Sequence, residues 1–69
     1  MAQIKIDVDT AQWAAESLAN DALEHPSADG ASGTALAAIR MYDALKVAGY
    51  GSAVEHVLPQ LARIAHVDL

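Results

Sequence analysis

The spacing of apolar residues near the start of the chain predicts a short β-strand. In residues 4–8, Ile4, Ile6 and Val8 alternate with charged side chains, and this two-residue period is typical of a half-buried strand. No later segment shows the same period. A single strand leaves its backbone N–H and C=O groups unpaired. We therefore expect it to pair either with the same strand of a second copy or with a strand edge on a target protein.

The period then lengthens to that of an α-helix and predicts three helices, over residues 10–24, 32–48 and 52–66. Asp9 is the expected N-cap of the first helix, and Gln12 completes a pair similar to a capping box. Pro26 ends this helix, and a polar loop over residues 25–33 follows. The expected fold is mainly α: one domain over residues 1–69, with a short N-terminal strand and three helices.

The turn between the second and third helices contains the usual boundary residues. Gly49 suits the left-handed position after a helix, and Ser52 with Glu55 matches a capping box for the next one. The third helix carries the clearest apolar stripe, but Pro59 lies within it. Proline lacks an N–H group, so a kink or a break is expected there, and the continuous stripe favours a kink.

The second helix is apolar on two sides. One face holds Ala38, Met41, Tyr42 and Leu45, and another holds Leu36, Ile39 and Val47. A helix with two apolar sides is buried on both, so we expect one side to face its own chain and the other a second copy. The predicted contacts of an intertwined or side-by-side homodimer are Ile4, Ile6, Val8, Leu36, Ile39 and Val47.

Composition strengthens the expectation of a dimer. The chain has 69 residues, 54% of them hydrophobic, and it contains no Cys. Many of the hydrophobic residues are Ala, which buries little area per side chain. Small domains of this kind usually need a disulfide, a metal or a partner chain. Without Cys, association with another chain is the remaining route.

The charge balance bears on the partner. Nine acidic and four basic residues give a net charge of −5. The cations Lys5, Arg40, Lys46 and Arg63 are scattered over the predicted elements, whereas phosphate backbones are bound by clustered Lys and Arg. A protein with a basic surface is therefore the expected partner, and direct binding of nucleic acid is not. No apolar run is long enough to cross a bilayer and no signal-peptide pattern opens the chain, so we expect a cytoplasmic protein.

Catalytic chemistry is not expected. His25, His56 and His66 are the only imidazoles, and none has the i, i+4 spacing of a helical metal pair. There is no Cys nucleophile and no nucleophile elbow around a Ser or Thr. The sequence predicts neither an enzyme nor a bound cofactor or metal.

Aromatic residues are the predicted partner contacts, because large amphipathic rings dominate binding energies at interfaces. Tyr42 ranks first, with Trp13 and Tyr50 beside it as candidates, and Arg40 and Asp43 as a charged rim. Each aromatic has a structural alternative. Trp13 could pack on Val8 as a hydrophobic staple, while Tyr42 and Tyr50 could belong to the packing of the helix hairpin.

Two DNA-binding layouts are similar to this one in outline. A strand followed by two helices resembles the ribbon-helix-helix repressors, a resemblance of layout that implies paired strands reading the major groove. Asp7 and Asp9 would then face phosphates and repel them. In a helix-turn-helix reading, residues 47–52 form the turn, and Glu55 and Pro59 occupy positions where base-reading residues belong.

The expected function is therefore regulatory. The profile is that of a small acidic homodimer that binds and inhibits another protein, similar to phage- or plasmid-encoded proteins that disable a host transcription factor. A strand-helix-helix repressor or antitoxin is the alternative, and a structural assembly subunit is a third possibility.

Overall fold

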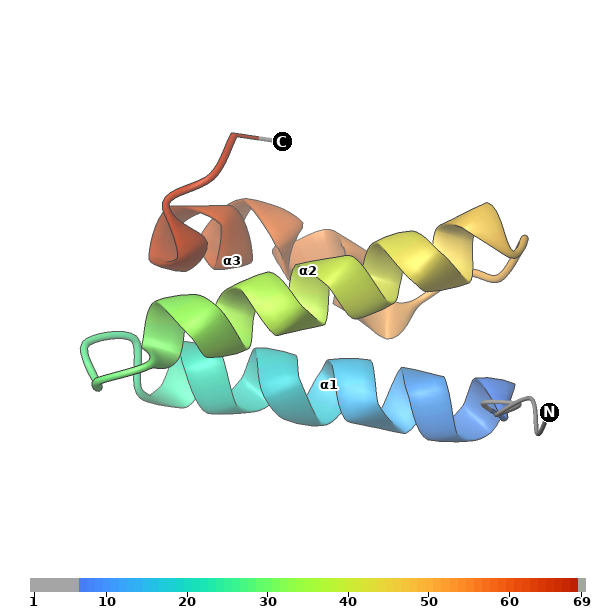
Figure 1. The fold of residues 1–69 in the computed structure, drawn as a ribbon, viewed down its shortest axis with the longest axis horizontal. Helices are drawn as coiled ribbons and strands as arrows, with labels where there is room; N and C mark the ends of the chain where they lie inside the picture. The colour runs from blue at the N-terminus through green and yellow to red at the C-terminus, as the bar shows by residue number, and fades with distance from the viewer. Residues whose placement is uncertain (1–6, 69) are drawn as a thin grey trace, which may run out of the picture.

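The computed structural model describes residues 7–68 and is mainly helical (Figure 1). Its elements are α1 (Val8–Glu24), α2 (Ala31–Val47), the short 3₁₀ helix η1 (Ala53–Val57) and α3 (Leu58–Ala65). No strand occurs within residues 7–68. The predicted mainly α class is confirmed. None of the helices in this range combines the length and apolar character that crossing a bilayer requires.

Helix α1 begins two residues earlier than predicted. Asp7 is its N-cap, in an extended conformation, and Val8 is already helical, so the prediction that a strand continues to Val8 and that Asp9 caps the helix is wrong. The backbone N–H of Ala11 donates to the Asp7 carbonyl over 2.9 Å. Because α1 starts at Val8, this residue shares a helix face with Ala11, three residues later. The Val8 side chain packs against the core. Residues 4–6 of the predicted strand lie outside the described part of the chain.

Helices α1 and α2 run antiparallel as a hairpin (Figure 1). Small side chains spaced three or four residues apart face each other along it. On α1 the buried positions are Ala11, Ala15, Ala19 and Ala22, and on α2 they are Ala31, Ala35, Ala38, Ile39, Tyr42 and Leu45. The distance between packed helix axes depends on the side chains at the contact, and alanine lets the two backbones come close. The hairpin is therefore held by an interface in which few side chains are large.

The two ends of α2 are defined by glycines with positive φ. Gly30 precedes the helix with φ 83°, and Gly49 follows it with φ 90°. The N–H of Gly49 donates to Lys46 O over 3.0 Å, and that of Tyr50 donates to Leu45 O over 2.9 Å. This is the Schellman pairing that terminates a helix. The predicted role of Gly49 is confirmed.

The third predicted helix is divided at its proline. Ser52 is the N-cap, as predicted, but its side chain accepts a hydrogen bond from Val54 N over 3.3 Å rather than from the Glu55 N–H of a capping box. Residues 53–57 then form a 3₁₀ helix, and α3 starts afresh at Leu58. Pro59 is thereby in the first turn of α3, where an N–H group has no helical partner to lose. The structure thus resolves the expected kink or break as a change of helix type.

Helix α3 packs mainly on α2, and η1 and α3 also contact α1. Val54 and Leu61 are the side chains that they insert most deeply, exposed by 2% and 0%. Leu61 is the one large side chain within residues 7–68 that is completely buried. The core of the domain is therefore an alanine-lined hairpin closed on one side by Leu61 and its neighbours.

Candidate protein-binding surface

Trp13 lies on the exposed side of α1. Its side chain is 68% exposed, although Trp is the largest apolar residue in the chain. It is absent from the group of residues that pack against the core, whereas Val8 belongs to that group. The alternative in which Trp13 is a hydrophobic staple on Val8 is therefore not supported.

The helix surface around Trp13 is acidic. Asp9 and Glu16 lie four residues before and three residues after it, both exposed, and neighbours at these spacings share a helix face. The same charge extends through the first part of the described chain. Residues 7–29 contain six carboxylates and no Lys or Arg; they are Asp7, Asp9, Glu16, Asp21, Glu24 and Asp29. We call Trp13 with Asp9, Glu16 and the exposed Asn20 the α1 acidic face.

Tyr42 is placed in the core. It is 8% exposed, and its hydroxyl donates to Glu55 Oε1 over 3.2 Å, which links α2 to η1. The structure thus supports the core alternative and leaves little of the Tyr42 ring exposed for the partner contact predicted for it. The cause is the docking of η1 and α3, which cover the side of α2 that carries this ring. Glu55, expected to complete a capping box, accepts from Tyr42 instead.

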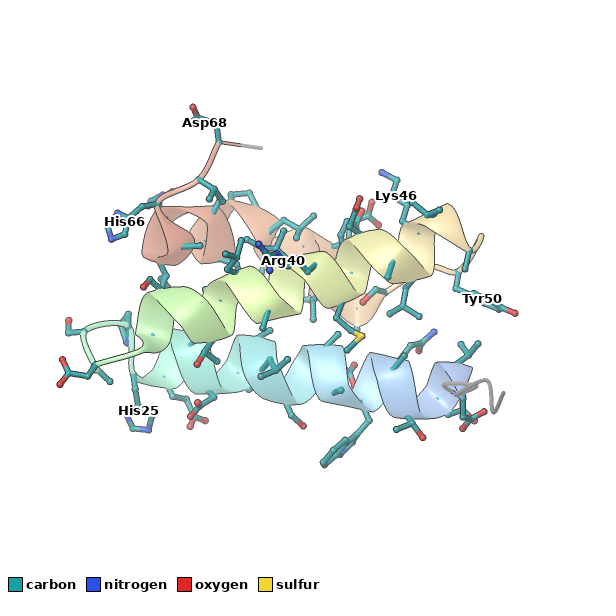
Figure 2. The ribbon with its side chains drawn as sticks, in the orientation of Figure 1. His25, Arg40, Lys46, Tyr50, His66 and Asp68 are labelled. Carbon is teal, nitrogen blue, oxygen red and sulfur yellow. The ribbon has the colours of Figure 1, made fainter. Side chains whose placement is uncertain are left out.

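Arg40 and Asp43 lie with Tyr42 at the edge of a hollow between α2 and α3. The hollow measures about 560 Å³ and is lined by Ile39, Arg40, Tyr42, Asp43, Ala44, Lys46 and Leu58. The Lys46 ammonium lies 5.8 Å from the centre of the Tyr42 ring, within the range of a cation–π contact. Figure 2 shows Arg40 and Lys46 extending from α2. The predicted charged rim is therefore present, but the ring between its members is largely covered.

Tyr50 stands at the open end of the hairpin, just after α2 (Figure 2). It is 47% exposed and borders an apolar groove of about 170 Å³, whose other lining residues are Val8, Ala11, Met41, Ala44, Leu45 and Ala48. The Tyr50 ring is therefore neither buried in the hairpin nor fully exposed, and both alternatives for it stay predictions.

The residues predicted to form the dimer are distributed unevenly. Ile39 is 8% exposed and packs within its own chain, which leaves little of its side chain for the predicted dimer contact. Val8 packs at the edge of the core. Leu36 is half-buried and Val47 is 83% exposed, so both are accessible on the outer side of α2. Ile4 and Ile6 lie outside the described residues.

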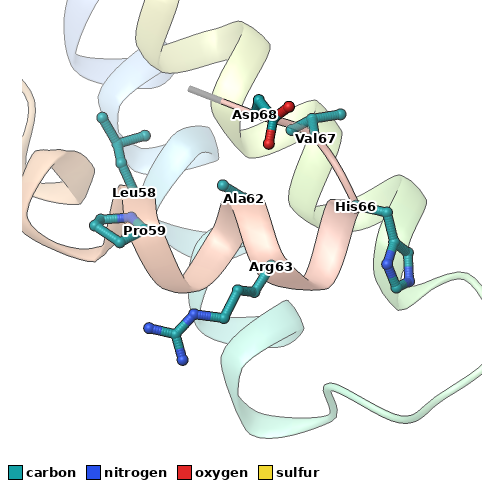
Figure 3. Close-up of a pocket in the computed structure, with 7 residues that line it drawn as sticks. All are labelled: Leu58, Pro59, Ala62, Arg63, His66, Val67 and Asp68. Atoms are coloured by element: carbon teal, nitrogen blue, oxygen red, sulfur yellow. The ribbon is translucent and has the colours of Figure 1, made fainter.

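A third hollow, of about 550 Å³, lies between α3 and the residues that follow it (Figure 3). Its polar lining consists of Arg63, His66 and Asp68, around an apolar floor that includes Leu58 and Ala62. Within residues 7–68, no three His, Asp or Glu side chains lie close enough together to bind one metal ion. The hollow offers a mixed surface rather than a concentrated charge.

A scan against protein-family models, a search of curated proteins and a search of solved structures each found no match to this chain. The candidate surface therefore rests on the residues themselves.

The sequence analysis missed the concentration of negative charge on α1. The signal is present in the sequence, because all basic residues except Lys5 follow residue 29. The net charge and the scattered positions of the cations do not by themselves show this separation of acidic from basic residues. The segregation becomes meaningful once the structure places Trp13 on the outside of that same helix.

Proposed function

We propose that this chain is a small acidic, homodimeric regulatory protein that binds another protein and covers one of its functional surfaces, such as the nucleic-acid-binding face of a transcription factor. The α1 acidic face is the surface that makes the contact. The observation that carries the proposal is the 68% exposure of Trp13 in the middle of this face.

An exposed tryptophan on a helix supports binding to a protein for an energetic reason. Trp is among the residues most enriched at the centres of protein interfaces, where one ring fills a pocket and excludes water. On α1 it stands between Asp9 and Glu16, so a pocket that accepts the ring would meet carboxylates on both sides. A basic rim around an apolar pocket is the complementary surface.

The charge pattern also supports a target that itself binds nucleic acid. A surface that binds phosphates is rich in Lys and Arg, and an acidic helix of opposite potential is attracted to it and competes for it. The six carboxylates of residues 7–29 have no neighbouring Lys or Arg in the same segment to neutralise them. Inhibition by occupation then requires no catalytic group.

The test is capture of a stoichiometric partner from host extract by the wild-type chain and by Trp13→Ala. Because Trp13 is mostly exposed, its truncation should leave helicity and thermal unfolding nearly unchanged. Loss of a central contact typically costs 2 kcal/mol or more, about thirtyfold in affinity, so the partner should be lost from the variant.

Tyr50→Ala is the matched comparison, since it removes another exposed aromatic ring away from the α1 acidic face. We expect it to retain the partner. Retention by Trp13→Ala with loss by Tyr50→Ala would move the contact to the open end of the hairpin and contradict the proposal. A direct shift of DNA by the purified protein would support the repressor alternative instead.

A further inference from the structure

The outer face of α2 carries a four-residue stripe whose spacing is the same in both directions. Leu36, Arg40, Asp43 and Val47 are separated by four, three and four residues. At about 100° per residue these positions fall within roughly 60° of one another around the helix. We call these four residues the outer stripe.

The outer stripe faces away from the core. Of the buried positions of α2, Leu45 lies opposite the stripe, and Ala35 and Tyr42 lie about 110–130° around the helix from its centre. The buried Ile39 borders the stripe beside Asp43, on the side where the hollow between α2 and α3 lies. Arg40 and Asp43 are exposed, and Val47 is 83% exposed. No ion pair is present among residues 7–68, so these two charges do not neutralise each other within the chain. The stripe thus has apolar ends and two opposite charges at its centre, all accessible.

We propose that the outer stripe is a homodimer interface, in which α2 packs antiparallel to α2 of a second copy around a twofold axis between Met41 and Tyr42. This register places Arg40 opposite the partner's Asp43, and Leu36 opposite the partner's Val47. The twofold axis repeats both contacts, giving two ion pairs flanked by two apolar pairs.

The order of charges selects this arrangement. When the two stripes run in opposite directions, each leucine faces a valine of the other copy and each arginine faces an aspartate. A parallel arrangement would instead set Arg40 against the partner's Arg40, which is repulsive. Residues spaced alternately four and three apart stay on one face of a helix and meet the same face of a paired helix. The four-three-four spacing of the outer stripe follows this pattern.

The surface beside the stripe has room for the partner's side chains. A hollow of about 340 Å³ is lined by Gly33, Leu36, Ala37, Arg40, Met41 and Ala44. The small residues on this flank leave space into which the partner's Val47 can pack. One stripe of three turns buries less area than a standard interface, so the dimer is expected to be weak, with micromolar dissociation.

The inference deepens the homodimeric part of the proposed function and rests on it, but it uses a surface separate from the α1 acidic face. The two can fail independently. Association of the purified chain tests the outer stripe, whereas partner capture by Trp13→Ala tests the acidic face.

The experiment exchanges the central charges one at a time. Arg40→Asp leaves two acidic residues facing two in a dimer, and Asp43→Arg leaves two basic residues facing two. Each variant alone should dimerise at least about tenfold more weakly than the wild type in sedimentation equilibrium, since attraction becomes repulsion at two symmetric sites. An equimolar mixture of the two should recover a dimer, because opposite charges then face each other.

The double variant Arg40→Asp/Asp43→Arg should also dimerise with the wild-type affinity, since the exchange restores both pairs. Arg63→Asp on α3 is the matched control: it makes the same charge change away from the stripe and should leave association unaltered. Circular dichroism of each variant verifies folding. A wild-type chain that stays monomeric at millimolar concentration, or single variants that associate as well as the wild type, would overturn the inference.

Discussion

Two residues with left-handed backbone conformations end helices in this protein, and they differ in chemistry. Gly49 follows α2 with φ 90°, and His66 follows α3 with φ 59°. Both turns use the same hydrogen-bond pairing; after α3, Val67 N donates to Ala62 O over 3.0 Å and His66 N donates to Arg63 O over 3.3 Å. Glycine adopts this conformation without a steric penalty, whereas an L-residue with a Cβ atom does not.

We therefore expect His66→Gly to stabilise the protein. A left-handed non-glycine residue costs about 1–2 kcal/mol, and the greater freedom of glycine in the unfolded chain offsets part of the gain. The free energy of unfolding measured in urea should rise by up to about 1 kcal/mol. Gly49→Ala is the mirror experiment and should lower it by a similar amount. A loss of stability in His66→Gly would mean that the imidazole makes compensating contacts in the hollow below α3.

For single residues, the sequence shows which residue types suit a cap or a turn better than it shows which residue occupies that place. Gly49 could be assigned because glycine is the residue that fits a left-handed turn, while His66 could not, since nothing in a histidine signals positive φ. Asp7 and Asp9 are equally able to cap a helix. The choice between them depends on whether Val8 reaches the core in register with Ala11, which is a property of the packed hairpin.

Among the elements, the hairpin of α1 and α2 depends on the small size of its interface residues. Ala15 and Ala35 are both 0% exposed, so no space remains at these positions for a larger side chain. Interiors are packed closely enough that added methylene groups force backbone shifts.

Ala15→Leu should consequently destabilise the protein by about 1–3 kcal/mol, despite adding apolar area. The matched control is Ala44→Leu, which makes the same change at an exposed position of α2 and should have little effect or a slightly favourable one. Thermal unfolding followed by circular dichroism measures both. If Ala15→Leu were neutral, the two helices would have to be separated by more space than the buried alanines indicate.

The periodicity of the sequence predicts the bounds of the helices closely. It predicts less well which neighbouring element covers each helix face. The pattern predicts the second helix at 32–48, and α2 occupies Ala31–Val47. The pattern also predicts its two apolar sides, but it places Ile39 on the outward side, whereas Ile39 lies inward. Ile39 and Val47 differ by about 80° around the helix, and the docking of α3 determines which of them is covered. Hydrophobic periodicity shows which faces of one helix are apolar, but it does not show where the neighbouring helices pack.

The whole molecule has a small core for its size. Domains of about this length bury only around 60% of the surface that their unfolded chains expose. Most of the completely buried side chains are alanines, and Leu61 is the large one among the described residues. Leu61 also joins the parts of the fold, because it extends from α3 into the cluster formed by the hairpin.

Leu61→Ala should accordingly cost about 2–5 kcal/mol, the range for removing a buried leucine from a close-packed site. Because one cluster contains residues of α1, α2, η1 and α3, we expect the whole helical signal to unfold in a single transition at lower denaturant. Leu23→Ala, at a half-buried position of α1, is the control and should cost clearly less. A loss below about 1 kcal/mol, or early unfolding of a minor fraction of the helical signal, would show that α3 docks as a separate unit on an independently stable hairpin.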